Sequence, residues 1–269
     1  MRTLLQILKE NWAWRTQVIN LGLFDLRKQA RGAVLGYFWF FAKPAVYILV
    51  FWFALEIGLK SGSSDPSAPP YILWLTAGLI PWFYIQAMLG AGVDVFHRYS
   101  YLVNKIKFPL SCIPTIYMIS TLIIHLGLVV ILFAIYFACG QGLDLYLLQI
   151  PVAMLAMIIF FELFSLLTSC LSALSKDFKN LMATLSTPFF WLSGIIFNVI
   201  ELGYDWLSTI LAFNPITVIA YTYRAALYDK YWIWERPEFI VGFAVAFFLT
   251  LVCAIVIFKR TREEVYDVL

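Results

Sequence analysis

Charged side chains are scarce in this chain of 269 residues. Asp, Glu, Lys and Arg together make up 13% of it, whereas hydrophobic residues make up 62%. An average soluble domain is about 25% charged and roughly 45–50% apolar, so this chain has too few polar side chains to cover a surface in water. The composition excludes a soluble enzyme, a nucleic-acid-binding domain and a disordered segment. A polytopic membrane protein remains, and the net charge of +3 is too small to indicate nucleic acid as a partner.

Motifs for catalytic, metal and nucleotide sites are also lacking. The two histidines, His97 and His125, stand 28 residues apart and form no H-E-x-x-H zinc motif. A Gly-Lys dipeptide is absent, which excludes a P-loop. The four cysteines stand far apart and form no C-x-x-C pair, so we expect them to be packing residues. We therefore expect no catalytic residue, no metal site and no cofactor in this chain.

Six long apolar runs are present, each bounded by charged or turn residues. Runs of about 20 residues suit helices that cross a bilayer, because a helix satisfies its backbone hydrogen bonds internally. Fifteen of the 19 basic residues fall in segments on the same side as the N-terminus, which predicts that both termini are cytoplasmic. We expect one all-α transmembrane domain over residues 1–269, with a cytoplasmic tail at 259–269. The predicted spans are residues 34–59, 71–92, 112–139, 147–172, 178–197 and 239–258.

Residues 1–33 have the pattern of an amphipathic helix that lies along the inner leaflet and leads into the first span. At 100° per residue, six apolar side chains within residues 1–28 fall in one narrow stripe. A soluble helix packed on a partner is the alternative. Further along, Pro44 predicts a kink or the true start of the first membrane helix. The side chains of the stripe are Leu5, Leu8, Trp12, Ile19, Leu23 and Leu26.

Residues 94–111 form the most informative cytoplasmic loop. The loop is long enough for a short helix, carries apolar residues between basic ones, and has a proline after them. An apolar and basic ridge between two spans suits docking on a cytoplasmic partner. The alternative is a basic loop whose apolar side chains dip into the membrane interface. The residues of the predicted ridge are Leu102, Lys105, Ile106, Lys107, Phe108 and Pro109.

Residues 198–238, on the outer side, are too apolar for a solvated loop and too interrupted for a span. Two apolar segments, 199–213 and 216–228, flank Asn214-Pro215 and are each too short to cross a bilayer. The pattern predicts two short helices that dip into the outer leaflet and return. An amphipathic surface loop is the alternative. Because irregular backbone at that depth must be covered by protein or water, half-helices indicate that something is handled at the outer face.

One acidic residue and several aromatic residues are candidates for a translocation path. Glu162 is the ionisable residue clearly inside a span, where charge is costly and usually functional. A structural, hydrogen-bonded glutamate is an equal alternative. Aromatic residues crowd the second and fifth spans, either as an interfacial belt or as a lining that stacks on sugar rings. The path candidates are Trp74, Trp82, Phe83, Glu162, Phe189, Phe190 and Trp191.

Several short motifs, taken in order, resemble the membrane subunit of bacterial ATP-binding-cassette (ABC) exporters of the polysaccharide type. The resemblance covers nearly the whole chain and fits the predicted frame of six spans. Each motif is weak alone, and their order makes them specific together. The motifs are residues 27–39 leading to Lys43-Pro44, Ala77-Gly78-Leu-Ile-Pro81-Trp82-Phe83, residues 103–111, Ser193-Gly194-Ile-Ile-Phe197, and Asn214-Pro215 with Arg224.

The resemblance implies a type-2 ABC exporter fold and a division of labour between subunits. Two copies of the chain would form a homodimer and pair with two cytoplasmic ATPase subunits, which bind ATP and Mg²⁺ and explain the missing P-loop. The ridge around 102–109 would be the coupling helix, and residues 198–228 would be gate helices with Asn214, Pro215 and Arg224. The basic residues before and within the first span would attract a pyrophosphate head group, or would only mark the cytoplasmic side. These residues are Arg27, Lys28, Arg31 and Lys43.

Within this family, Lys107-Phe-Pro-Leu-Ser111 looks most like the teichoic acid permeases of Gram-positive bacteria. We therefore expect a multi-pass protein of the bacterial plasma membrane that moves a polyprenyl-pyrophosphate-linked wall teichoic acid from the inner to the outer leaflet. Its partners would be membrane lipid, the lipid-linked glycopolymer and the ATPase, with no nucleic acid. The alternatives are an O-antigen or capsular polysaccharide exporter, a drug or lipid exporter of the same superfamily, and an integral-membrane glycopolymer transferase.

Overall fold

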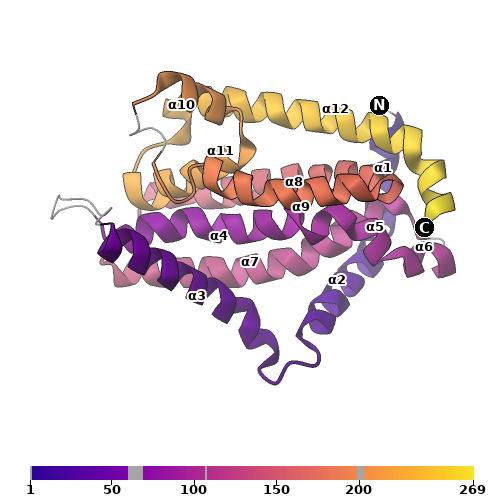
Figure 1. The fold of residues 1–269 in the computed structure, drawn as a ribbon, viewed down its shortest axis with the longest axis horizontal. Coiled ribbons are helices and arrows are strands. Elements are labelled where there is room, and N and C mark those ends of the chain that lie inside the picture. Colours follow the sequence, from indigo (N-terminus) through magenta and orange to yellow (C-terminus); the bar gives the residue numbers. More distant parts are fainter. Residues whose placement is uncertain (1, 60–68, 107, 199–202) are drawn as a thin grey trace.

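The computed structural model describes residues 2–59, 69–106, 108–198 and 203–269 (Figure 1). Most of these residues are helical and none of them lies in a strand, which confirms the all-α class. Among them, five helical stretches are long and apolar enough to cross a membrane. These stretches are Gly36–Gly58, Tyr71–Ile106, Leu110–Ala138, Leu145–Leu174 and Pro237–Val268.

Helix α4 (Tyr71–Leu89) forms the centre of the bundle (Figure 1). In its apolar stretch 78% of the residues are buried, against 6% in the stretch that contains α3 (Trp39–Trp52) and 11% in α12 (Pro237–Val268). Both α7 (Ile113–Ala138) and α8 (Gln149–Leu174) pack against α4. A helix surrounded by protein needs no polar face, which explains why α4 is apolar all round.

The predicted fifth span, residues 178–197, is a shorter helix in the structure. Helix α9 (Lys176–Leu192) has 17 residues, or about 26 Å at 1.5 Å per residue, which is less than the ~30 Å hydrocarbon core of a bilayer. Gly194 follows α9 with a left-handed φ of 67°, a conformation that commonly ends helices. Because α9 is short, the number of six spans stays a prediction.

Two short helices form a sharp corner at the end of the molecule that the sequence predicts to be the outer one. Helices α10 (Asp205–Ala212) and α11 (Pro215–Arg224) are bent by 97° relative to each other, and α11 continues as a wider turn to Asp229. The two short helices were predicted, and their entry into the outer leaflet stays a prediction. Residues 199–202, at the start of the first predicted segment, lie outside the described residues.

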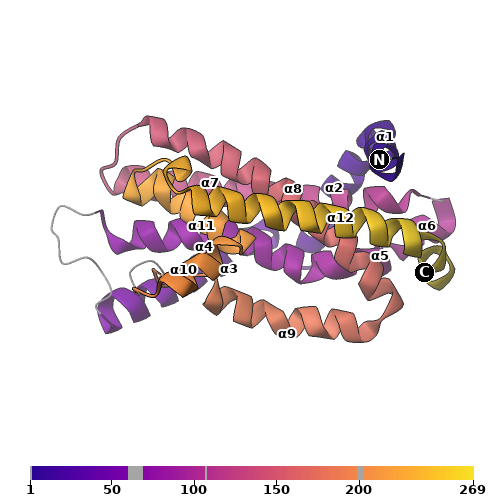
Figure 2. The same cartoon turned by 90° about the horizontal axis from the view of Figure 1, so that it is seen from above.

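Local chemistry explains where α11 begins. The Asn214 side chain accepts a hydrogen bond from the Ile216 backbone N–H at 3.0 Å, which caps the first turn. Pro215 occupies the first helical position, where a missing backbone N–H costs nothing. Helix α12 runs along α8 and past α11 (Figure 2), so the corner is held from a second side.

The predicted N-terminal amphipathic helix is present as two helices. Trp14 separates α1 (Arg2–Ala13) from α2 (Arg15–Ala30). One member of the predicted apolar stripe, Leu26, is half-buried. The other five are exposed, as a stripe that faces lipid requires: Leu5, Leu8, Trp12, Ile19 and Leu23.

Helix α3 begins at Trp39, five residues before Pro44. Pro44 therefore lies inside the helix, and the prediction that it starts the helix is wrong. Residues 31–38 connect α2 to α3 at a point well away from the bundle, and the two helices diverge from it as the arms of a V (Figure 1). This geometry leaves most of α3 unburied by the rest of the chain.

Residues 259–268 of the predicted tail are the last turns of α12, and Leu269 follows them. Val265 is fully buried, and Asn104 Nδ2 donates a hydrogen bond to the Leu269 carbonyl oxygen at 2.8 Å. With 32 residues, α12 is about 48 Å long and exceeds the thickness of the hydrocarbon core. Its C-terminal end therefore reaches the loop that follows α4.

Candidate functional site

The loop between α4 and α7 contains two short helices, α5 (Val95–Arg98) and α6 (Ser100–Ile106). On α6 the side chains of Tyr101, Lys105 and Ile106 are exposed, with Ile106 58% exposed. An exposed isoleucine beside a lysine fits the predicted docking ridge. Lys107 lies outside the described residues.

Two members of the predicted ridge are buried instead of exposed. Leu102 is 2% exposed and Phe108 is 1% exposed. The Phe108 ring packs edge-to-face on Trp14, with ring centroids 4.9 Å apart. Because Trp14 belongs to the distant N-terminal segment, the loop sequence alone could not predict this contact. The exposed part of the ridge is therefore the end of α6, with Lys105 and Ile106, and Pro109 beyond it is half-buried.

Asp25 of α2, which sequence analysis missed, fixes the N-terminal segment to this loop. The Arg98 guanidinium donates to Asp25 Oδ1 at 3.0 Å, and Gln29 and Ser120 donate to Oδ2 at 2.7 and 3.0 Å. Burial alone raises the pKa of the Asp25 carboxyl, but these hydrogen bonds and the charge of Arg98 outweigh it and hold the pKa below its usual value. The available signal was a carboxyl in the predicted interfacial helix, two residues before the basic pair Arg27-Lys28.

A second acidic residue, Asp94, holds the other side of the loop. Its carboxylate accepts hydrogen bonds from Lys179 at 2.5 Å and from Ser172 at 3.0 Å, and His97 Nδ1 lies 2.7 Å from it. Lys179 belongs to α9 and Ser172 to α8. The two carboxylates therefore connect the loop to α2, α8 and α9.

Replacing Asp25 with asparagine is expected to destabilise the protein by about 1–2 kcal/mol, because Arg98 loses its charged partner. In the wild type, the ionised Asp25 carboxylate stabilises the folded state at every pH above the unfolded-state pKa of Asp25, which is about 4. This stabilisation is lost as the pH falls through the folded-state pKa of Asp25, which is lower. Melting curves in detergent between about pH 3 and pH 6 measure it. The asparagine variant should lack this acid-dependent loss, and the exposed Asp177→Asn should behave like wild type. Parallel pH profiles for Asp25→Asn and wild type would contradict the assignment.

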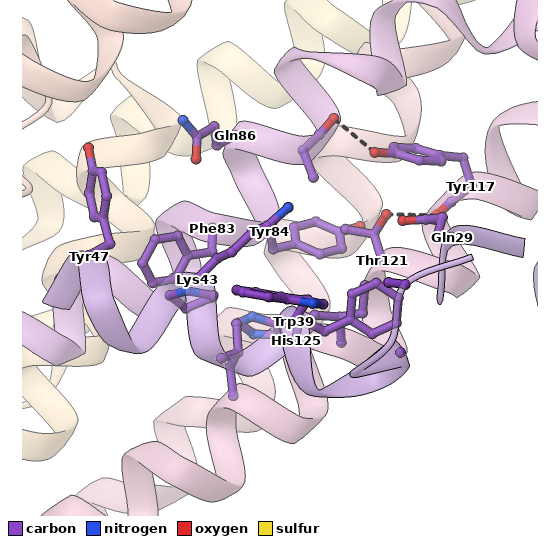
Figure 3. Close-up of a pocket in the computed structure, with 17 residues that line it drawn as sticks. Gln29, Trp39, Lys43, Tyr47, Phe83, Tyr84, Gln86, Tyr117, Thr121 and His125 are labelled. Atoms are coloured by element: carbon purple, nitrogen blue, oxygen red, sulfur yellow. Dashed lines mark hydrogen bonds between the residues drawn. The ribbon is translucent and has the colours of Figure 1, made fainter. Parts of the chain in front are cut away.

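A cavity of about 790 Å³ lies between the end of α2, the first half of α3 and facing parts of α4 and α7 (Figure 3). Of the four predicted head-group residues, Lys43 lines it. Arg27, Lys28 and Arg31 are exposed at the end of α2 and do not line it. The cavity's other polar residues were not among the predicted site residues, and they are Gln29, Tyr47, Tyr84, Gln86, Tyr117, Thr121 and His125.

Four of the predicted path aromatics come together between α3, α4 and α9. Phe190 packs on Trp82 and Trp191, with ring centroids 5.2 and 5.7 Å apart. Tyr47 of α3 contacts both Phe83 and Phe190. Phe189 is half-buried next to this cluster in the sequence. Phe83 and Tyr47 also line the cavity, so the aromatic cluster is continuous with it.

Glu162 lies apart from the cavity lining, in a polar contact between helices. The side chain is half-buried, and the Thr115 hydroxyl lies 2.5 Å from Glu162 Oε1 and 2.7 Å from Asn11 Oδ1. Glu10 accepts a hydrogen bond from Ser111 one turn away. These contacts tie α1 to α7 and α8, as the structural alternative for Glu162 expects.

Two of the three predicted gate residues, Asn214 and Arg224, converge on the end of α9, whereas Pro215 occupies the first position of α11. Asn214, which caps α11, also donates through Nδ2 to the Ser193 hydroxyl at 2.8 Å. Arg224, at the other end of α11, donates to the carbonyl oxygens of Gly194 at 2.6 Å and of Ile195. The last carbonyls of a helix have no partner within it, and here a side chain from α11 binds the carbonyls just beyond α9.

Arg224 is fully buried, and its guanidinium lies 3.4 Å from the centre of the Trp74 ring. Such a cation–π contact stabilises a desolvated guanidinium by about 2 kcal/mol. Gly78, one turn after Trp74 on α4, makes room for this arrangement. A Cβ at Gly78 would stand 2.5 Å from Arg224 Nη2 and 2.9 Å from the Ile195 carbonyl oxygen. Glycine is therefore required at position 78 of the Ala77-Gly78 motif for steric reasons, which the sequence did not indicate.

The described part of the chain contains no cluster of three or more His, Cys, Asp or Glu that could hold a metal ion. Its candidate sites are therefore an inner ridge, an aromatic cavity with one lysine, and an outer cluster around Arg224.

Comparisons with known proteins give a consistent result. Residues 16–228 match the family described as ABC-2 type transporter. An O-antigen export system permease protein, RfbA of Myxococcus xanthus, is 22% identical over 265 residues, which cover 97% of this chain and 98% of that protein. The RfbA permease of Klebsiella pneumoniae is 22% identical over 248 residues, covering 91% and 92% of the two chains.

Proposed function

Because this chain belongs to the ABC-2 type transporter family, we propose that it is the membrane permease subunit of an exporter for an O-antigen or a related lipid-linked polysaccharide. The observation that carries the proposal is similarity over nearly the full length to permeases named for O-antigen export. Its ATPase would be a separate subunit, since the sequence has no P-loop.

The relatives favour O-antigen over wall teichoic acid, which the sequence alone had favoured. That expectation depended on Leu110 after Pro109 in the inner loop. Leu110 is 1% exposed, so a leucine there has a packing role that is independent of the polymer. Teichoic acid specificity therefore has no support in these observations.

In the proposed complex, α6 docks on the ATPase and the corner of α10 and α11 forms the outer gate. The exposed Lys105 and Ile106 support the first assignment. The convergence of Asn214 and Arg224 on the end of α9 supports the second. The unburied faces of α3 and α12 leave room for a second copy of the chain and for lipid.

The direct test is reconstitution of the purified chain in vesicles with its candidate ATPase subunit. We expect polymer transport that requires ATP and stops when the ATPase is omitted. The same vesicles supplied with teichoic acid or O-antigen precursors distinguish the two substrates. A complex that transports neither polymer, but exports drugs or lipids, would contradict the proposal.

Docking through α6 predicts the effect of reversing its exposed character. Lys105→Glu combined with Ile106→Asp should lower polymer-stimulated ATP hydrolysis at least tenfold and leave the melting temperature within about 2 °C of wild type, because both side chains are exposed. The control is Lys259→Glu, the charge reversal of another exposed lysine, on α12. Phe108 is unsuited to this test because it packs on Trp14. Normal stimulation in the double variant would exclude α6 as the docking element.

A further inference from the structure

The size and position of the cavity in Figure 3 suit a ligand. Its volume of about 790 Å³ falls within the ~300–1,000 Å³ of typical small-molecule sites. The residues that α4 contributes belong to its later turns, and those from α7 lie between Tyr117 and Leu128. With the N-terminus on the cytoplasmic side, as proposed, these parts of both helices lie in the inner half of the bilayer.

The charge of the lining favours an anion. None of the 17 lining residues is acidic, and Lys43 is the single lysine or arginine among them. Lys43 is exposed and makes no ion pair or hydrogen bond with any described residue. A lysine without a partner on a membrane helix is costly and marks a functional site. As a compact point charge, an ammonium group is a common ligand for phosphate.

The rest of the lining favours a sugar beside that anion. Trp39, Tyr47 and Tyr84 present aromatic rings, and the amides of Gln29 and Gln86 offer both donors and acceptors. The Tyr84 hydroxyl is buried, yet it has no hydrogen-bond partner among the described residues. A buried polar group without a partner is destabilising, and a ligand hydroxyl or amide that reaches Tyr84 would remove this cost. A hydrocarbon chain could not form this hydrogen bond with the Tyr84 hydroxyl.

We propose that this cavity binds the pyrophosphate and first sugar of a polyprenyl-linked saccharide, with Lys43 on the phosphates and Tyr84 on the sugar. This inference rests on the proposed transport of a lipid-linked polysaccharide and names the residues that select its head group. The polyprenyl chain stays in the bilayer beside α3, whose surface is largely unburied.

The test measures equilibrium binding to the full-length chain in lipid nanodiscs. The probe is radiolabelled polyprenyl pyrophosphoryl N-acetylglucosamine. Three further ligands separate its parts: polyprenyl pyrophosphate without the sugar, uncharged polyprenol, and free N-acetylglucosamine 1-phosphate. We expect the complete probe to bind most tightly and polyprenol at least tenfold more weakly.

Substitutions of Lys43 and Tyr84 test the role that each residue has in binding. Lys43→Gln should weaken both pyrophosphate probes at least tenfold, whereas Lys43→Arg should retain most of the affinity. Tyr84→Phe removes one oxygen atom and should weaken the sugar-bearing probe about threefold or more without changing the binding of polyprenyl pyrophosphate. Lys176→Gln, an exposed lysine on α9 that does not line the cavity, is the matched control and should bind like wild type.

Unchanged binding in Lys43→Gln, or polyprenol binding as tight as that of the pyrophosphate probe, would overturn the inference. Transport assayed on the same variants separates this failure from that of the proposed function. If Lys43→Gln transports polymer normally and binds the probe normally, the site is wrong and the function stands. If wild type binds the probe through Lys43 but transports no polysaccharide with its ATPase, the site stands and the function is wrong.

Discussion

Replacing Arg224 with alanine is expected to lower the melting temperature of the purified protein by roughly 6–12 °C. The substitution removes two charged hydrogen bonds to the Gly194 and Ile195 carbonyls and a close stack on Trp74. Hydrogen bonds to charged groups contribute about 1.5–3 kcal/mol each, and the loss is partly offset because a buried cation no longer needs desolvation. A net loss of about 3 kcal/mol corresponds to that temperature shift in a chain of this size.

Loss of Arg224 should also lower transport, because its side chain connects three helices. It joins α11 to the end of α9 and to α4, so its loss frees one side of the proposed outer gate. Polymer export by Arg224→Ala in reconstituted vesicles should fall at least tenfold at a temperature where the variant remains folded. Arg224→Lys keeps the charge but loses the planar fork, and should give an intermediate melting temperature.

Arg236 is the matched control for Arg224. It lies near the start of α12, but its side chain is 39% exposed and stands 4.0 Å from Glu238. Surface ion pairs contribute about 0–1 kcal/mol, so Arg236→Ala should melt within about 2 °C of wild type. If Arg224→Ala melts as Arg236→Ala does, the buried guanidinium does not hold the corner.

Replacing Gly242 with valine is expected to displace the corner of α10 and α11 and to abolish export. A Cβ at this position of α12 would collide with the Ala212 carbonyl group and stand 2.9 Å from the Phe213 backbone nitrogen. These are backbone atoms, so no change of rotamer relieves the clash, and such overpacking costs about 1–3 kcal/mol or more. Helix propensity alone predicts that Gly242→Val stabilises α12, because valine is slightly more favourable than glycine inside a helix.

Gly142 provides the control for this substitution. It lies in the loop before α8, has no heavy atom within 4 Å of a Cβ position and does not need a left-handed backbone. Gly142→Val should therefore leave export and the melting temperature unchanged. Normal export by Gly242→Val would show that α12 and the corner can separate without consequence.

The sequence predicted the elements whose limits depend on local chemistry. The third span was predicted at 112–139 and α7 covers Ile113–Ala138, because a bilayer sets the length of an apolar run. The break at Asn214-Pro215 was also predicted from local chemistry. Asn214 caps the adjacent first turn of α11, and Pro215 occupies its first position.

Contacts between distant parts of the chain could not be predicted in this way. Phe108 was expected to be exposed because basic residues precede it, and Trp14 buries it from 94 residues away. Asp25 acquires its role only through Arg98 and Ser120, which are 73 and 95 residues distant. The resemblance indicated Arg224 as a gate residue but gave no reason for its burial, which depends on the space at Gly78.

The unbroken length of α12 has a mechanical consequence. Near its start Gly242 lies against the outer corner, and beyond its last turn Leu269 accepts a hydrogen bond from Asn104 of α6. This continuous helix of about 48 Å contacts α6 at one end and the corner of α10 and α11 at the other. We therefore expect a displacement of α6 to be transmitted to the corner by α12 moving as one body, without any change in its own internal hydrogen bonds.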